Sequence, residues 1–164
     1  MRYFITFACY GARLHGDESG SVDRSHNLVG SRLLEPDARR VVIERQKMRQ
    51  EPYVLDEPRR AVVLASILQH CVYRGWQLLA AHVRSNHVHA IVEAQIRPEK
   101  IMNELKSYAS RELAHLGKDA PSRRRWARHG STRWLWNDRD VRDAIQYVIE
   151  DQGKPMALFV VDEL

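Results

Sequence analysis

The hydrophobic positions change their spacing several times along the chain, which predicts a mixture of strands and helices. Short runs rich in aromatic and β-branched residues are typical of strands, and apolar residues recurring every three to four positions are typical of helices. The predicted strands cover residues 2–10, 76–83, 87–94 and 156–161, and the predicted helices cover 37–50, 58–74, 98–116 and 138–151. A basic loop over 117–137 is expected to end in a further short aromatic strand.

This order of elements predicts an α+β domain in which an antiparallel sheet carries helices on one side. Strands 76–83 and 87–94 are separated only by Arg84-Ser85-Asn86, the pattern of an antiparallel hairpin. Residues 11–34 are rich in Gly, Ser, Asp and Arg and predict a long loop, a kind of segment that is often functional. A length of 164 residues suits a single domain over 1–164.

The balance of charges adds a weak indication of function. The chain has 26 Lys and Arg against 21 Asp and Glu, and a basic surface suits a polyanionic partner. No apolar run approaches the length of a membrane helix, so we expect a soluble protein inside the cell. Cys9 and Cys71 are the only cysteines, and we expect both to be small buried hydrophobes rather than parts of a disulfide or a metal cluster.

The clearest candidate site is a pair of histidines in one predicted strand. His87 and His89 flank Val88, and side chains two positions apart in a strand point to the same face. Two neighbouring imidazoles can share a cation, provided that a third ligand comes from elsewhere. A histidine-triad hydrolase would have histidine at position 91, which is Ile91, and a facial iron triad would have an acid at Val88. Spacing alone leaves open two ordinary surface histidines.

The segment SRRRWARHGSTRW combines arginines with tryptophans. Guanidinium groups suit phosphates and indoles suit stacking on unpaired bases, so this mixture predicts contact with single-stranded or hairpin DNA. A solvated basic loop with tryptophans in the core is the alternative, because Trp134 and Trp136 alternate like strand residues. The candidate DNA-binding residues are Arg123, Arg124, Arg125, Trp126, Arg128 and Arg133.

Several segments together resemble a known family. The stretch NHVHAIVE, the N-terminal strand with the loop YGARLHGDESGSVDR, and a last helix containing YVIEDQ resemble the HUH single-tyrosine (Y1) transposases, namely the IS200-like and REP-associated tyrosine transposases. The resemblance spans nearly the whole chain. It implies a ferredoxin-like HUH endonuclease fold formed by one Y1 transposase domain.

The resemblance also implies a function. Family members cut and rejoin single-stranded DNA near hairpins by attack of a tyrosine, which forms a 5′-phosphotyrosine intermediate and mobilises an insertion or repeat element. By resemblance, Tyr147 is the nucleophile, and His87 and His89 hold a divalent ion, Mg²⁺ or Mn²⁺. The expected partners are single-stranded or hairpin DNA and a second copy of the chain in a homodimer. The expected location is the bacterial cytoplasm, in association with the nucleoid.

The third metal ligand is where the chain departs from the family pattern. In IS200-like relatives a glutamine follows the tyrosine by four residues, on the same helix face. Here that position is Asp151, and Gln152 lies one residue later. A hard cation accepts either oxygen. Spacing favours Asp151 and residue type favours Gln152, so both are candidates.

A second tyrosine competes for the role of nucleophile. Tyr108 lies on a predicted helix between Lys106 and Arg111, although it shares an apolar stripe with Ile101 and Leu105. Residues alone do not separate it from Tyr147; the resemblance favours Tyr147. Two other functions stay open: a domesticated, catalytically silent protein that binds DNA hairpins, and a metal hydrolase that cleaves with water.

Overall fold

The computed structural model describes residues 1–12 and 38–162. Most of the long loop predicted at 11–34 lies outside these residues. None of the described helices is long and apolar enough to span a membrane. The elements, in chain order, are β1 (Arg2–Cys9), α1 (Ala38–Lys47), α2 (Glu57–Arg74), β2 (Gln77–Val83), β3 (His87–Glu93), α3 (Pro98–His115), β4 (Trp126–Leu135), α4 (Asp138–Glu150) and β5 (Ala157–Val160).

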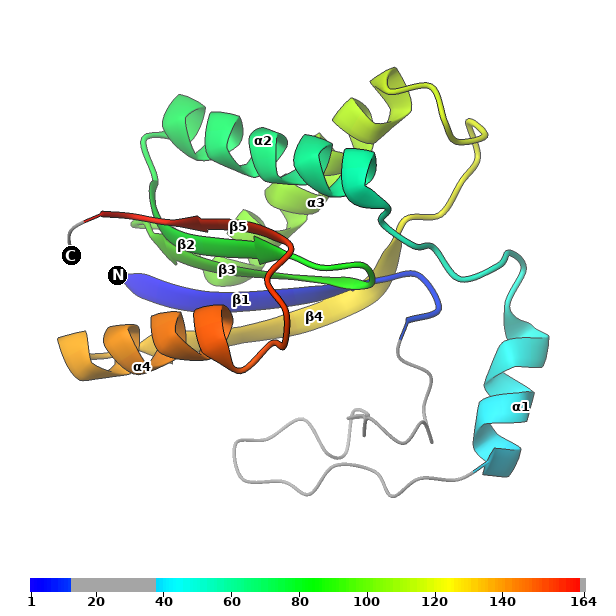
Figure 1. The fold of residues 1–164 in the computed structure, drawn as a ribbon, viewed down its shortest axis with the longest axis horizontal. Helices are drawn as coiled ribbons and strands as arrows, with labels where there is room; N and C mark the ends of the chain where they lie inside the picture. Colours follow the sequence, from blue (N-terminus) through cyan, green and yellow to red (C-terminus); the bar gives the residue numbers. More distant parts are fainter. Residues whose placement is uncertain (13–37, 163–164) are drawn as a thin grey trace.

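The strands form one antiparallel sheet, which confirms the predicted α+β class. The order of its five strands is β4-β1-β3-β2-β5, so β3 lies at the centre (Figure 1). The hairpin predicted between residues 76 and 94 is present as β2 and β3. Strand β1 pairs with β3 on one side and with β4 on the other. The N-terminal strand is thereby placed beside a strand about 80–90 residues later in the chain.

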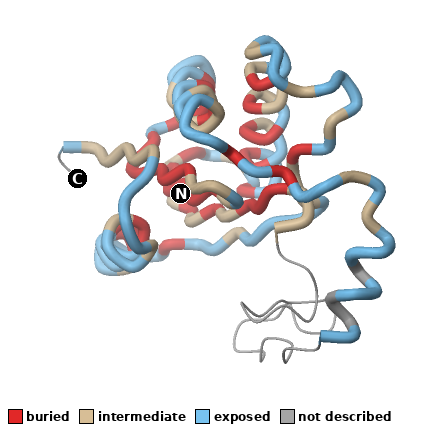
Figure 2. The backbone as a smooth tube through the Cα atoms, turned by 45° about the vertical axis from the view of Figure 1, so that its right-hand side comes forward, coloured by how far each residue is buried: buried red, intermediate tan, exposed pale blue. Residues whose placement is uncertain are grey.

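The expectation of helices on one side of the sheet was wrong. Helices α2 and α3 pack on one face, and α4 covers the other (Figure 1). Strands β2 and β3 are buried along nearly their whole length, as the distribution of buried residues in Figure 2 shows. Strands that are apolar on both faces need cover on both faces, and α4 provides the second layer.

The basic segment before α4 also differs from its prediction. Instead of a loop ending in a short strand, residues Trp126–Leu135 form a ten-residue strand, β4, at the edge of the sheet. Charged and polar side chains are typical of edge strands, which explains why the composition resembled that of a loop. Helix α1 ends three residues before its predicted end at residue 50, and the other helices and strands begin and end within one residue of their predicted bounds.

The ends of α2 and the two cysteines follow directly from the sequence. Asp56 caps α2 by accepting a hydrogen bond from the backbone of Arg59, and Gly75 ends that helix in a left-handed conformation. Cys9 and Cys71 are buried free thiols, as predicted, and burial raises the pKa of each to about 12.

The contact between β4 and β1 leaves no room for a side chain at Gly130. A Cβ there would lie 2.5 Å from the carbonyl oxygen of Thr6 and 2.5 Å from Met102 Sδ. We expect Gly130→Ala to lower the free energy of unfolding by about 1–3 kcal/mol, because backbone cannot move away without disturbing the strand pairing. Urea denaturation measures this change. Ser131→Ala on the same strand is the control, with an expected change below about 0.5 kcal/mol; equal losses in the two variants would contradict the interpretation.

Candidate functional site

The two histidines of β3 lie on the face of the sheet covered by α4. His89 is only 3 % exposed, and its Nδ1 shares a hydrogen bond of 2.7 Å with Thr6 Oγ1 on the adjacent β1. His87 is half-buried, and its Nδ1 lies 2.7 Å from Asn86 Oδ1. Asn86 Oδ1 can accept a hydrogen bond from Nδ1 of His87, in the tautomer that carries the ring hydrogen on Nδ1. Thr6 can accept a hydrogen from Nδ1 of His89 in the same tautomer.

A glutamine oxygen meets both rings on their other side. Gln152 Oε1 lies 3.3 Å from His87 Nε2 and 3.1 Å from His89 Nε2. In the tautomer just described, each Nε2 presents a lone pair toward this oxygen. Three electron-pair donors therefore converge on one point, an arrangement that a cation between them would stabilise.

The spacing of these donors fits a small metal ion. Neighbouring ligand atoms lie roughly 3.0 Å apart around an octahedral cation with bonds of about 2.1 Å, and about 3.4 Å apart around a tetrahedral one. The two separations to Gln152 Oε1 fall in this range. Within the described residues, no three His, Cys, Asp or Glu side chains are grouped to hold a metal. The candidate triad differs from such a group because its third donor is an amide.

The end of α4 decides which of the two candidate third ligands reaches the histidines. Asp151 caps the helix, where its backbone N–H donates to the carbonyl oxygen of Tyr147, and its side chain is exposed. Gly153 follows with φ of 71°, a left-handed conformation that turns the chain toward β5. Gln152, between them, points to the imidazoles. The amide side chain is thus brought to the histidines at the irregular spacing, one residue beyond the helical position.

A third histidine holds this turn in place. His82 on β2 is fully buried; its Nδ1–H donates to the carbonyl oxygen of Val148, and its Nε2 accepts from the backbone N–H of Met156. Burial lowers the pKa of His82, which favours this neutral form. Both ring nitrogens are used within the fold. His82 therefore ties the last turn of α4 to the start of β5, on either side of Gln152.

Tyr147 lies next to the histidine pair. Its side chain projects from α4, is 42 % exposed, and contacts the ring of His89 with centroids 5.8 Å apart. Phe4 contacts both rings, at 5.4 Å from His89 and 5.9 Å from Tyr147. Phe4 and Thr6 were not singled out from the sequence. The alternation of β1 could have identified them, because Phe4 and Thr6 point to the face of the sheet opposite to that of the core residues Tyr3 and Ile5.

Tyr108 occupies a different part of the molecule. It lies on α3, on the other face of the sheet, where its ring packs on His70 with centroids 3.8 Å apart. The guanidinium of Arg111 lies 4.2 Å from the centre of the Tyr108 ring. The structure therefore brings Tyr147, and not Tyr108, to the two histidines of β3.

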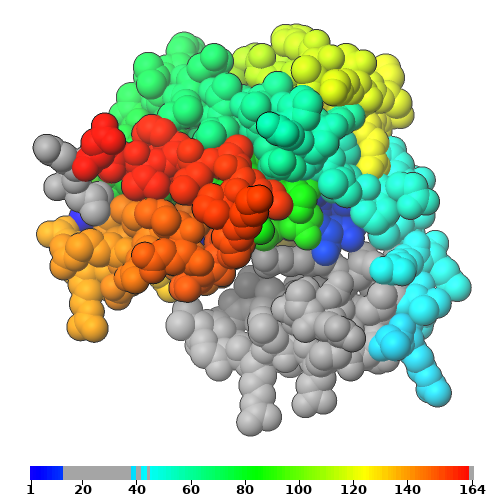
Figure 3. Space-filling model, viewed as in Figure 1, coloured from blue at the N-terminus to red at the C-terminus, as the bar shows by residue number. Residues whose placement is uncertain are grey.

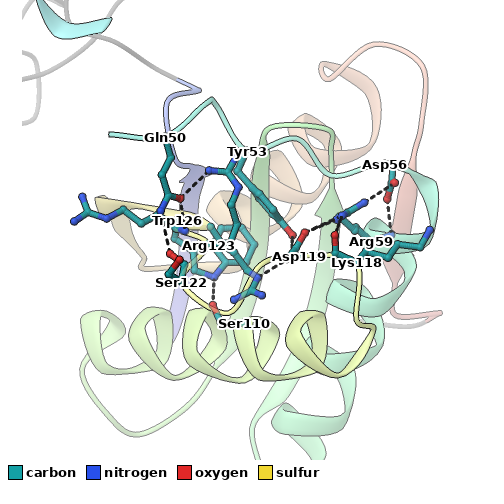
Figure 4. A network of polar contacts seen from close by, with 12 residues as sticks. Gln50, Tyr53, Asp56, Arg59, Ser110, Lys118, Asp119, Ser122, Arg123 and Trp126 are labelled. Atoms are coloured by element: carbon teal, nitrogen blue, oxygen red, sulfur yellow. Dashed lines mark hydrogen bonds and ion pairs between the residues drawn. The ribbon is translucent and has the colours of Figure 1, made fainter. Parts of the chain in front are cut away.

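Half of the candidate DNA-binding residues are engaged inside the fold (Figure 4). Arg123 donates to Gln50 Oε1 at 3.0 Å and to the carbonyl oxygen of Glu51 at 2.7 Å. Trp126 donates from its indole to the carbonyl oxygen of Lys106 at 3.0 Å. Arg125, the third member of this group, is buried and donates to Asp119 at 3.1 Å.

The other three candidates are exposed. Arg124, Arg128 and Arg133 lie on or just before β4. Arg133 points to the same face as the histidines, because its guanidinium lies 5.6 Å from the centre of the Phe4 ring. Phe4 thus connects Arg133 with His89 and Tyr147. Figure 3 shows that the turn between β2 and β3 reaches the surface beside the segment that joins α4 to β5.

Comparison with known proteins assigns the chain to a family of transposases. The family described as "Transposase IS200 like" matches residues 37–139, well over half of the chain. The chain therefore belongs to the IS200-like transposase family, as the resemblance indicated. The match includes His87 and His89 and ends in the first turn of α4, before Tyr147 and Gln152.

One solved structure with similarity to the chain is a REP-associated tyrosine transposase bound to a REP hairpin. Its TM-score is 0.48 and its sequence identity 13%, over 90% of this chain and 63% of the other. The protein thus spans less than two thirds of that transposase, and a likeness at this level carries no functional argument. No curated protein matches the chain significantly.

Asp119 is the centre of the internal network that engages the arginines. It accepts hydrogen bonds from Tyr53, Arg59 and Arg125, at 2.7, 2.7 and 3.1 Å (Figure 4). Burial alone would raise the pKa of Asp119, but these hydrogen bonds outweigh it and hold the pKa below its ordinary value. The carboxylate therefore stabilises the fold above the ordinary carboxyl pKa of about 3.9, and this contribution is lost as the pH falls through the lower folded value.

We expect Asp119→Ala to lower the free energy of unfolding at neutral pH by about 3–5 kcal/mol, because the buried guanidinium of Arg125 loses its carboxylate and the half-buried Arg59 keeps only its ion pair with Asp56. Chemical denaturation at neutral and acidic pH measures the loss, which should shrink at acidic pH. Asp143→Ala is the matched control, since its ion pair with Arg139 is exposed and long at 3.8 Å. If Asp119→Ala lowers the free energy of unfolding no more than Asp143→Ala does, the network around Asp119 does not stabilise the fold.

Proposed function

We propose that the protein is a transposase that cuts and rejoins single-stranded DNA near hairpins through a covalent intermediate on Tyr147. The observation that carries this proposal is the convergence of two imidazoles and an amide oxygen beside an exposed tyrosine, on one face of the sheet. The family assignment supplies the general class of protein. The geometry is the reason for proposing these particular residues.

The proposed step is an in-line displacement at phosphorus. The phenolic oxygen of Tyr147 attacks a backbone phosphate, the bond from phosphorus to the 3′ oxygen breaks, and the DNA keeps a 5′-phosphotyrosine link. The phenolic proton is given up to solvent, and the departing 3′ oxygen takes up a proton to become a hydroxyl. Attack by that hydroxyl or by another 3′ end reverses the step and rejoins DNA. The exposure of Tyr147 leaves its oxygen accessible to a strand.

The side chains next to Tyr147 are proposed to bind a metal ion and to orient its ligands. His87, His89 and Gln152 would hold a divalent ion, Mg²⁺ or Mn²⁺, as a set of one oxygen and two nitrogen donors. A bound cation polarises a phosphate oxygen and helps to orient the displacement. Thr6 and Asn86 fix the orientation of the two imidazoles through their Nδ1 atoms.

The exposed arginines are the proposed contacts to the DNA backbone. Arg133 lies nearest to the site, and its guanidinium can bind a phosphate next to the one that reacts. Arg124 and Arg128, which are exposed near the start of β4, are the other two proposed contacts. The homodimer expected from the resemblance stays a prediction.

We expect Tyr147→Phe to abolish the covalent intermediate, because it removes only the attacking oxygen and keeps the ring against Phe4 and His89. The protein is incubated with Mn²⁺ and labelled single-stranded oligonucleotides that contain hairpins, and a denaturing gel detects a labelled band of protein size. Tyr108→Phe is the control and should keep the band. Cleavage without a covalent band would favour hydrolysis by water, and binding without cleavage would favour a catalytically silent hairpin-binding protein.

We expect Gln152→Ala to weaken Mn²⁺ binding by at least tenfold, because one of three donors is lost. Titration calorimetry of the free protein measures this affinity without any DNA. Asp151→Ala, one residue away, is the control and should change the affinity by less than about twofold, the effect of an exposed charge. The opposite ranking of the two variants would make Asp151 the ligand, and unchanged binding in both would remove the proposed triad.

A further inference from the structure

Two tryptophans form an exposed stack at the end of β4. The rings of Trp134 and Trp136 lie 5.1 Å apart and are tilted by only 12°. They are 40 % and 76 % exposed. Large aromatic surfaces in water are unusual in a folded domain and indicate a binding surface. Neither indole belongs to the site around Tyr147, and the sequence pattern had left open that both are buried.

Contacts with Tyr3 and Asp140 connect the two tryptophans to the rest of the fold. Trp134 packs edge-on against Tyr3, a fully buried ring, with centroids 4.9 Å apart. The backbone N–H of Trp136 donates to Asp140 at 3.0 Å, in the turn that begins α4. Trp136 therefore presents an exposed indole whose backbone is anchored and whose ring already stacks on Trp134, so a flat ligand can stack on it.

The surroundings favour a nucleobase over a second protein. Two indoles are a small fraction of the roughly 800 Å² that each partner buries in a stable protein interface. Arg133, the neighbour of Trp134 in the chain, points to the opposite face of the sheet, over Phe4 and toward Tyr147. Strand β4 is the last strand of the sheet, so a DNA strand that crosses this edge meets the arginine and the indole stack in succession. Alternating cationic and aromatic contacts are typical of single-strand binding.

We infer that Trp136, supported by Trp134, is a stacking platform for an unpaired base of the DNA strand whose phosphate Arg133 binds. The inference rests on the proposed function, because it takes the strand at Arg133 to be the substrate. It adds a base-binding position that is distinct from the reacting phosphate and lies on the other side of the sheet edge. Stacking of this kind tolerates any base, so the platform supplies affinity and not sequence recognition.

The test compares two probes that differ only in their bases. Fluorescence anisotropy is measured in metal-free buffer, so that no strand is cut, with labelled oligothymidylate and with an abasic oligonucleotide of equal length and charge. The intact protein should prefer oligothymidylate. Trp136→Ala should weaken oligothymidylate binding by about tenfold and leave abasic binding within about twofold. Trp136→Phe, which keeps an aromatic ring, should recover part of the preference.

Tyr73→Ala is the matched control, because Tyr73 is also 76 % exposed but lies on α2. It should bind both probes like the intact protein. Equal binding of the two probes by the intact protein, no binding of either, or an unchanged preference in Trp136→Ala would overturn the inference. A change in molar mass on light scattering with unchanged DNA binding would assign the stack to self-association. The gel assay for the covalent adduct distinguishes the two proposals. Adduct formation without a preference for bases would contradict the stacking platform and leave the proposed function unaffected.

Discussion

The register of the central strand β3 is the constraint on which the candidate site depends. Antiparallel pairing places Thr6 of β1 and His82 of β2 on either side of His89, in one row across the sheet. The Thr6 hydroxyl orients the ring of His89, while His82 holds the end of α4. A slip of one residue in either pairing would turn His89 into the opposite face, toward α2 and α3. The strong burial of β2 and β3 makes such a slip costly, so the core and the site specify the same register.

The second determinant is the way α4 ends. A helix continued regularly beyond Glu150 would carry Asp151 above Tyr147 and leave Gln152 on another side. Instead the helix stops, and the contacts of His82 with Val148 and Met156 fix both ends of the short connection. Gln152 lies within that connection. The irregular spacing of tyrosine and glutamine is therefore compatible with a triad, because the backbone and not the helical repeat sets the direction of the amide.

Sequence patterns predicted the parts of this protein that depend on local spacing. Alternation placed His87 and His89 on one face, and apolar periodicity gave the helices nearly their observed bounds. The choice between Asp151 and Gln152 depended on a helix end and a left-handed Gly153, which spacing alone does not determine. The environment of Arg123 depended on Gln50, which lies 73 residues earlier in the chain. Arg125 shares its nearby partner Asp119 with the distant Tyr53 and Arg59. Phe4 was missed because an apolar residue in a strand reads as core until its neighbours on the other face are known.

Strand β4 shows how one segment can serve stability and binding at once. Its first residues turn inward, where Trp126 donates to α3 and the preceding Arg125 reaches Asp119. Near its end, Arg133 and Trp134 are exposed and point to opposite faces, with Arg133 toward the site and Trp134 away from it. This mixed run of arginine and tryptophan thus contains both structural groups and accessible groups. The accessible groups lie at the open edge of the sheet. A single strand of DNA could contact both faces of the sheet there without displacing any part of the core.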